Sequence, residues 1–419
     1  MSATPRILPR AILTVALVGA LGAALAGCGD TADPAESPSP GATGSSPAST
    51  DLSAGSVTVT IDGTDHTYRA AYLVDGIDAT VSEGTYASTS SDEPVFLVVN
   101  GGSLTVTDAT VEKSGDAGTN DPQRPGDVSD EYSFFGTNSA VVVIGEGSTA
   151  SLSDSTITTA SSGSNAVVAV DGAIAAVQSS RIETSGDSSR GLHATYGGTI
   201  TAGDVDIMTA GAHSATVATD RGGGTVTVNG EGEGDGDGDG DNTFSTSGEG
   251  SPLIYSTGDI AVSDVTGTAD GSEAVVIEGR NTATIADSEV TSSGEHAVMI
   301  YQSFSGDAAD ADAAGSVGSL TVRDTDITFT GSGALAYFTN TTAELALDDV
   351  EVDASSGILA SAQQDRWGNA GSNGAKAKIT VADSTLTGSV EAGPGSSIAV
   401  VTTEGGSVTG ATSGDVTID

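Results

Sequence analysis

Three arginines stand out in a chain that is short of positive charge. The 419 residues include 57 Asp and Glu but only 13 Lys and Arg, for a formal net charge of −44. Arg221, Arg280 and Arg366 each follow a similar apolar segment. Because a guanidinium group binds carboxylates through paired hydrogen bonds, these residues are candidates to bind an acidic polysaccharide. Alternatively, they pair with neighbouring acids such as Asp220 and Asp365. The same net charge excludes nucleic acid as a partner, because its phosphates would be repelled.

Aromatic residues are rare, and four of them lie close to the same apolar segments. The chain has 8 Tyr, 7 Phe and 1 Trp, and Tyr301, Phe304, Phe338 and Trp367 fall in three successive repeats. Aromatic rings aligned along a surface suit the apolar faces of sugar rings, so these four residues are candidates to bind polysaccharide. The alternative is that neighbouring loops fold over the rings and bury them.

Groups suited to catalysis are sparse. The four histidines show no metal-ligand spacing and no nearby nucleophile motif. Arg366, Asp365 and His296 are the only candidates for catalysis, and no catalytic residue is assigned. If the protein is an enzyme, a polysaccharide lyase in which Arg366 acts as the base and Ca²⁺ acidifies the substrate fits these residues. The sequence favours a binding protein that needs no cofactor.

One acidic run has the ligand type that Ca²⁺ prefers. Between Glu231 and Asp241 six carboxylates alternate with glycine, and Asp235, Asp237, Asp239 and Asp241 are candidate ligands. The bidentate Glu that closes an EF-hand loop is missing, because Thr246 stands at its position. The simpler interpretation is a solvated, disordered insertion, for which weak Ca²⁺ affinity is left open.

The N-terminus reads as an export signal. Arg6 and Arg10 precede an apolar run, and Leu25-Ala26-Gly27-Cys28 follows it. This motif resembles the bacterial lipobox, which implies cleavage after residue 27, a lipid on Cys28 and a place on the outer face of the bacterial cell membrane. Residues 28–55 are rich in Ser, Pro and Thr and are expected to form a flexible tether. Cys28 is the only cysteine, so the chain forms no internal disulfide.

The rest of the chain repeats one phrase. Thr105–Val111 recurs as Ser151–Ile157 and as Thr321–Ile327, with an Asp at the same place in each. Ten positions align with this one, eight of them Asp and the other two Ser179 and Gly230, mostly 23 to 26 residues apart, with longer intervals where residues are inserted. Alternating polar and apolar residues predict three short strands per repeat and no long helix. These features predict an all-β, single-domain β-solenoid of about ten coils.

The repeated phrases also resemble a known family. Gly-Gly-Thr-Ile-Thr-Ala, Gly-Ser-Leu-Thr-Val-Arg-Asp and Ser-Glu-Ala-Val-Val-Ile-Glu-Gly are similar to segments of exported right-handed parallel β-helix proteins of the pectin-lyase-like superfamily and its adhesin-like members. The resemblance covers about residues 75 to 415. It implies a right-handed parallel β-helix, but not one function, because the superfamily includes lyases, hydrolases and non-catalytic binders.

The organisation follows from these elements. Residues 56–100 are expected to form an N-terminal cap and the first strands, and residues 101–419 the parallel β-helix. Insertions are expected near residues 113–132, 230–243, 303–318 and 362–375. The first strand of each coil is apolar on both faces, which predicts either a cover or a binding surface. Its expected outward residues are Val142, Val168, His193, Val217, Ile254, Val276, Met299, Ala336 and Leu359.

These observations favour a surface-anchored, adhesin-like lipoprotein. It is expected to act as a monomer and to bind polysaccharide, or another cell-surface partner, along the first-strand sheet. The alternative is a polysaccharide lyase or glycoside hydrolase that acts on acidic polysaccharide in the same groove.

Overall fold

The computed structural model describes residues 49–118, 128–230, 242–303 and 317–419. Residues 46–419 form one compact unit, so a soluble protein of residues 29–419 retains the whole of it. The signal peptide, Cys28 and most of the tether lie outside the described residues. None of the helices in the described ranges has the length and apolarity needed to cross a bilayer.

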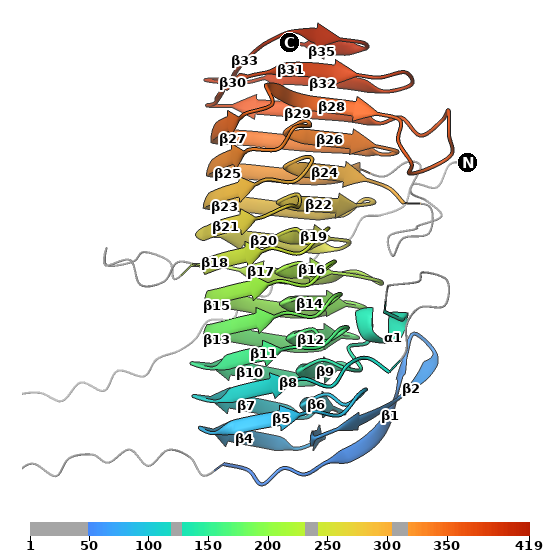
Figure 1. The fold of residues 1–419 in the computed structure, drawn as a ribbon, viewed down its shortest axis with the longest axis vertical. Coiled ribbons are helices and arrows are strands. Elements are labelled where there is room, and N and C mark those ends of the chain that lie inside the picture. Colours follow the sequence, from blue (N-terminus) through green and yellow to red (C-terminus); the bar gives the residue numbers. More distant parts are fainter. Residues whose placement is uncertain (1–48, 119–127, 231–241, 304–316) are drawn as a thin grey trace, which may run out of the picture. The chain divides into compact units, whose positions relative to one another are not determined.

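The described chain is a parallel β-helix, which confirms the β-solenoid predicted from the repeats (Figure 1). The first strand of each coil stacks on the next in a 13-stranded sheet, called here the first sheet. Its strands are β3 (Tyr72–Asp75), β6 (Phe96–Val99), β9 (Val141–Ile144), β12 (Val167–Val170), β14 (Leu192–Thr195), β16 (Val217–Thr219), β19 (Ile254–Ser256), β22 (Val275–Glu278), β24 (Val298–Tyr301), β26 (Ala336–Thr339), β28 (Ile358–Gln363), β31 (Ser389–Ala392) and β34 (Thr412–Ser413).

The remaining strands of the coils form an 18-stranded sheet, called here the second sheet. They are β4 (Asp78–Ser82), β5 (Thr85–Ser88), β7 (Ser103–Thr107), β8 (Thr110–Lys113), β10 (Thr149–Ser153), β11 (Thr156–Thr159), β13 (Ile174–Thr184), β15 (Gly198–Thr209), β17 (Gly224–Val228), β18 (Asn242–Thr246), β20 (Asp259–Ser263), β21 (Val265–Ala269), β23 (Thr282–Ser292), β25 (Val317–Phe329), β27 (Thr342–Ala354), β29 (Lys376–Ala382), β32 (Ser397–Thr402) and β35 (Val416–Ile418). A small separate sheet pairs β30 (Thr385–Thr387) with β33 (Ser407–Thr409).

The recurrent Asp marks the corner at which the second sheet bends. Eight aligned Asp residues, from Asp108 (φ 52°) to Asp383 (φ 43°), have left-handed backbone, and Ser179 has it too (φ 46°). Asp tolerates this conformation better than most residues with a side chain. The N–H groups two residues later pair with the neighbouring coil, as in Thr110 N–H to Gly84 O at 2.9 Å. Backbone conformation therefore explains the repeated Asp, because the main-chain N–H two residues later is paired with the neighbouring coil and does not need the carboxylate as an acceptor.

Further coils lie beyond the ten aligned repeats, at both ends. The corner of the coil formed by β4 and β5 is Glu83 (φ 57°), and Gly405 (φ 76°) stacks against Asp383 near the other end. Both have left-handed backbone without being Asp, so the sequence alignment stopped short of these coils.

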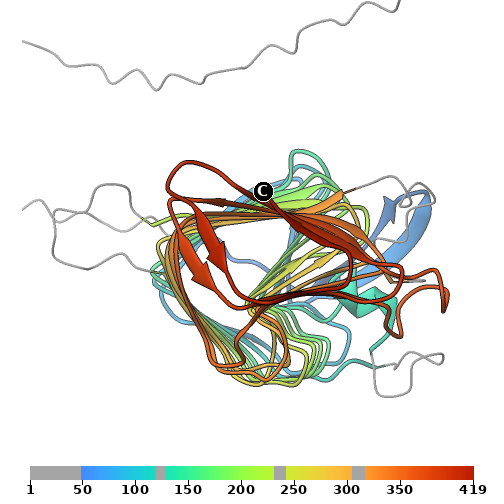
Figure 2. The ribbon, with the colours of Figure 1, turned by 90° about the horizontal axis from the view of Figure 1, so that it is seen from above.

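The antiparallel hairpin of β1 (Gly55–Ile61) and β2 (Thr64–Ala70) lies on the outward face of the first sheet. Ile61 and Tyr68 pack with Leu97, Val142 and Val168 in one buried cluster. Figure 2 looks along the stack and shows this hairpin and the short helix α1 (Asp130–Ser133) beside the coils. The hairpin thus covers a side of the solenoid, and residues 72–99 already belong to its coils.

A buried lysine is the unusual feature of the interior. Lys113 is 1% exposed, and its Nζ donates to Ser90 O at 2.9 Å and Gly115 O at 2.6 Å. Burial lowers the pKa of Lys113 from its ordinary 10.5 to about 8, against the opposing effect of Glu93, Asp92 and Asp116. The folded chain therefore releases this proton at a lower pH than the unfolded chain does.

This pKa predicts a pH-dependent difference between the wild type and Lys113→Met. Between about pH 8 and 10.5 the unfolded chain holds a proton that the folded chain has lost, so stability rises with pH. From pH 7 to pH 10 the wild type should gain about 2 kcal/mol relative to Lys113→Met. Urea unfolding of both proteins at the two pH values measures this gain. A difference that stays constant with pH would contradict the lowered pKa.

Candidate functional site

The outward row of the first sheet provides the floor of the candidate site. The strand register aligns Val168, His193, Ala218, Tyr255, Val276, Met299, Tyr337 and Ser361 in this row. The expected outward positions Val217, Ile254, Ala336 and Leu359 were wrong, because these side chains belong to the core. Where a strand is apolar on both faces, alternation cannot fix its register, and a slip of one residue exchanges the faces.

Part of this apolar row is covered. A cover was one of the two explanations offered for a strand that is apolar on both faces; the other was a binding surface. The hairpin covers Leu97, Val142 and Val168, and Phe135, just after α1, packs against the same cluster. Tyr68 Oη ties the two covers together by donating to Phe135 O at 2.8 Å. Further along the stack, Tyr255 and Met299 are only partly buried.

A cleft of about 460 Å³ opens where this cover ends. Tyr255, Val276 and Met299 form its floor, and the loop after β28 supplies Arg366 and Trp367. The volume lies in the range of about 300–1,000 Å³ that is typical of small-molecule sites. A hollow of about 590 Å³ near the C-terminal coils is lined mainly by small residues without aromatic rings. The cleft is therefore the better candidate.

A buried carboxylate organises the cleft near Tyr301. Glu278, at the end of β22, is 2% exposed. Its Oε2 accepts from Tyr255 Oη at 2.7 Å and from Tyr301 Oη at 3.0 Å, and its Oε1 accepts from Ser303 Oγ. Burial raises the pKa of both tyrosines well above 10, and the Glu278 charge adds to this effect. The two phenols thus remain protonated and act as fixed donors to Glu278 rather than as bases.

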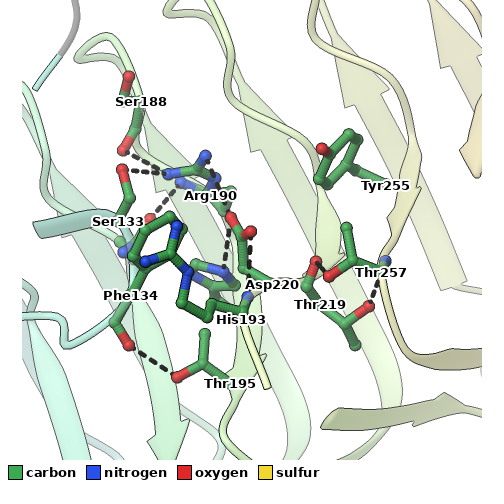
Figure 3. A network of polar contacts seen from close by, with 12 residues as sticks. Ser133, Phe134, Ser188, Arg190, His193, Thr195, Thr219, Asp220, Tyr255 and Thr257 are labelled. Atoms are coloured by element: carbon green, nitrogen blue, oxygen red, sulfur yellow. Dashed lines mark hydrogen bonds and ion pairs between the residues drawn. The ribbon is translucent and has the colours of Figure 1, made fainter. Parts of the chain in front are cut away.

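A second buried carboxylate lies toward α1. Asp220 is 1% exposed, and Figure 3 shows Arg190 and His193 directed at it. Arg190 Nη2 and His193 Nε2 each lie 3.7 Å from Asp220 Oδ2. Arg190 Nη1 also donates to Ser133 Oγ of α1 at 3.4 Å. This network joins α1 to the sheet beside the cleft.

The single tryptophan forms one wall of the cleft. Trp367 lies 4.8 Å from Tyr301 between ring centroids, and the Arg366 guanidinium lies 4.9 Å from the centroid of a Trp367 ring. Asn373 Nδ2 donates to the carbonyls of Asp365 and Trp367, which fixes the loop that carries them. The structure therefore brings three of the candidate residues together: Tyr301, Trp367 and Arg366.

Other candidates lie elsewhere. Phe338 is 0% exposed and points into the core, so its expected place beside Tyr301 was wrong for the same register reason. Arg221 packs over Phe134 at 4.4 Å and lies 3.8 Å from Asp130, at the rim of the cleft. Arg280 is exposed just after β22 and is not one of the residues that line the cleft. Phe304 lies outside the described residues.

The three catalytic candidates do not converge as one group. Tyr337 Oη donates to Asp365 Oδ2 at 3.0 Å, and the His296 ring stacks on Tyr337 at 4.1 Å. His296 Nδ1 is already engaged, because it accepts from the Ala334 N–H at 3.1 Å. Arg366 lies instead on Trp367. A lyase that uses Arg366 as its base gains no support from this arrangement.

The Ca²⁺ prediction remains open. Asp235, Asp237, Asp239 and Asp241 lie outside the described residues. Within the described ranges, no three His, Cys, Asp or Glu residues are grouped so as to hold a metal ion.

Glu278 and Tyr255 were not among the residues predicted for the site, and Asp220 was expected only as a partner of a neighbouring arginine. Glu278 ends the strand Val-Val-Ile-Glu, in which all four residues are buried, and Asp220 directly follows the buried strand β16. A charged residue at the end of, or directly after, a short strand of apolar and small residues was the available signal. Comparisons with protein-family models, with curated proteins and with solved structures find no match to this chain.

Proposed function

We propose that this chain is a lipid-anchored surface protein whose β-helix binds polysaccharide in the cleft between α1 and the Trp367 loop. Cys28 would carry the anchor, as the lipobox resemblance implies. The proposal also places the chain among the exported, adhesin-like members of the pectin-lyase-like superfamily. The parallel β-helix and the repeated phrases support this placement. One observation carries the binding function: the apolar row is covered at its N-terminal end, yet opens into an aromatic cleft further along.

Aromatic and polar groups in the cleft suit a sugar ring. Tyr255, Tyr301 and Trp367 offer apolar ring faces, and the carboxylates of Glu278 and Glu273 are hydrogen-bond acceptors for hydroxyl groups. These aromatic and acidic side chains belong to several successive coils, so a polymer lying in the cleft would contact more than one coil. This spread favours binding over catalysis, because catalysis needs titratable groups at one reacting bond.

A hydrolase in the same cleft is the rival function. The specific observation in its favour is that two buried carboxylates, Asp220 and Glu278, both line the cleft. Each carboxylate, however, accepts hydrogen bonds or ion pairs from neighbouring side chains. Incubation of the protein with any retained polysaccharide separates the two functions, because a hydrolase releases new reducing ends.

Retention of residues 29–419 on immobilised neutral, acidic and basic polysaccharides tests the proposal. We expect retention on at least one polymer, and its loss in Trp367→Ala and Tyr301→Ala, because both changes remove a ring from the cleft. Ile174→Ala is the matched control, because Ile174 is 49% exposed on the second sheet, in β13. Runs with Ca²⁺ and with chelator show whether the acidic insertion contributes. Failure of every polymer to retain the protein would overturn the proposal.

A further inference from the structure

The charge that the cleft offers to a ligand is negative. Among its lining residues, Arg190 and Arg366 oppose Asp220, Glu273 and Glu278, which gives 2 − 3 = −1 with His213 neutral. The net charge of the whole chain, −44, has the same sign. An anionic polymer approaching the cleft would be repelled, and a cationic polymer would be attracted.

Both arginines of the cleft already have partners. Arg190 lies 3.7 Å from Asp220 and donates to Ser188 O and Ser133 Oγ at 3.4 Å. The Arg366 guanidinium packs on Trp367. A carboxylated sugar would have to compete with these contacts. The arginines are therefore poor receptors for the acidic polysaccharide that the sequence suggested.

The carboxylates of Glu278 and Glu273, which line the cleft together with the aromatic rings, can accept further hydrogen bonds. Glu278 accepts three hydroxyl donors, whereas two carboxylate oxygens have room for about four. Glu273 is half-buried in the cleft lining, and the hydrogen bond from Ser272 Oγ is long, at 3.5 Å. Tyr255, Tyr301 and Trp367 lie beside them, and aromatic faces attract cations.

From this arrangement we infer that the polysaccharide bound in the cleft carries free amino groups, as a polymer of non-acetylated glucosamine units does. This inference rests on the proposed glycan-binding function and specifies its ligand class. The ammonium group of the sugar donates to Glu278 and Glu273, and the ring lies against Tyr255 and Trp367. An acetylated or uronic-acid polymer lacks the charge that these carboxylates stabilise.

Trp367 provides a direct test, because it is the only tryptophan in the chain and lines the cleft. Its fluorescence in the protein of residues 29–419 is titrated with matched oligomers of glucosamine, N-acetylglucosamine and galacturonate. We expect the glucosamine oligomer to change the emission at the lowest concentration. Glu278→Gln should weaken this binding by about tenfold or more, because the neutral amide no longer attracts the ammonium group of the sugar. A tenfold change corresponds to about 1.4 kcal/mol.

Glu344→Gln controls for non-specific attraction to an acidic protein. Glu344 is exposed in β27 of the second sheet, so its loss changes the net charge equally without altering the cleft. Equal weakening by both variants would overturn the inference. Equal or tighter binding of the acetylated or the galacturonate oligomer would overturn it as well, but would leave glycan binding intact. No emission change with any oligomer, together with no retention on any polymer, would overturn both.

Discussion

Replacing Phe338 with alanine is expected to lower the free energy of unfolding by about 3–5 kcal/mol. Phe338 is 0% exposed and lies between Ile300 and Ala362 of the adjacent coils, inside the solenoid. The change removes its ring from a packed interior and leaves a cavity that stacked coils cannot easily close. Urea unfolding monitored by circular dichroism measures the loss.

Trp367→Ala is the matched comparison for Phe338→Ala. Trp367 is half-buried on a loop, so its removal should cost clearly less stability while abolishing retention on polysaccharide. Phe338→Leu should retain most of the stability that Phe338→Ala loses, because leucine fills most of the space of the ring. If Phe338→Ala instead left stability unchanged and weakened retention, the outward placement expected from the sequence would be correct.

Removal of the Asp220 carboxylate should also destabilise the protein strongly. Asp220→Ala leaves the Arg190 and His193 side chains, 13% and 0% exposed, facing an apolar methyl group instead of a carboxylate. Breaking a buried ion pair by removing one partner costs about 3–5 kcal/mol. Because Arg190 also bonds to Ser133, α1 should loosen from the sheet, and hydrogen exchange in residues 128–140 should rise.

Asp220→Asn separates the loss of charge from the loss of shape. Its amide oxygen still accepts from the Arg221 N–H, which lies 3.1 Å from Asp220 Oδ1, so we expect a smaller loss of stability. Asp326→Asn is the exposed control and should change stability by less than about 0.5 kcal/mol. Stability of Asp220→Ala within that margin would show that the network does not hold α1.

The repeat made the fold predictable, because each coil must present the same residues to its neighbours. In phrases such as Thr321–Ile327, inward and outward residues alternate on each side of the corner Asp324, so strand type, strand direction and stacking followed from them. The extent of the solenoid was harder to predict, because left-handed backbone at the corner accepts Glu83 or Gly405 as well as Asp. The alignment depended on residue identity, whereas the fold depends on backbone conformation.

The site was less predictable, because its strands are buried on both faces. Val217 and Ala218 are both apolar, and only the register with neighbouring coils decides which of them faces outward. This ambiguity misplaced Phe338 and concealed Tyr255. Trp367 and Tyr301 were found because aromatic residues are rare in this chain. Glu278, and the pairing of Asp220 with Arg190 and His193, were not predicted because the segments around them looked purely structural.

A structure of residues 29–419 bound to a fragment of a retained polysaccharide would show directly where the sugar lies. We expect a sugar ring over Tyr255 and Met299, against Trp367 and within hydrogen-bonding distance of Glu278. A sugar bound on the second sheet, or along the Asp corners, with the cleft empty, would contradict it.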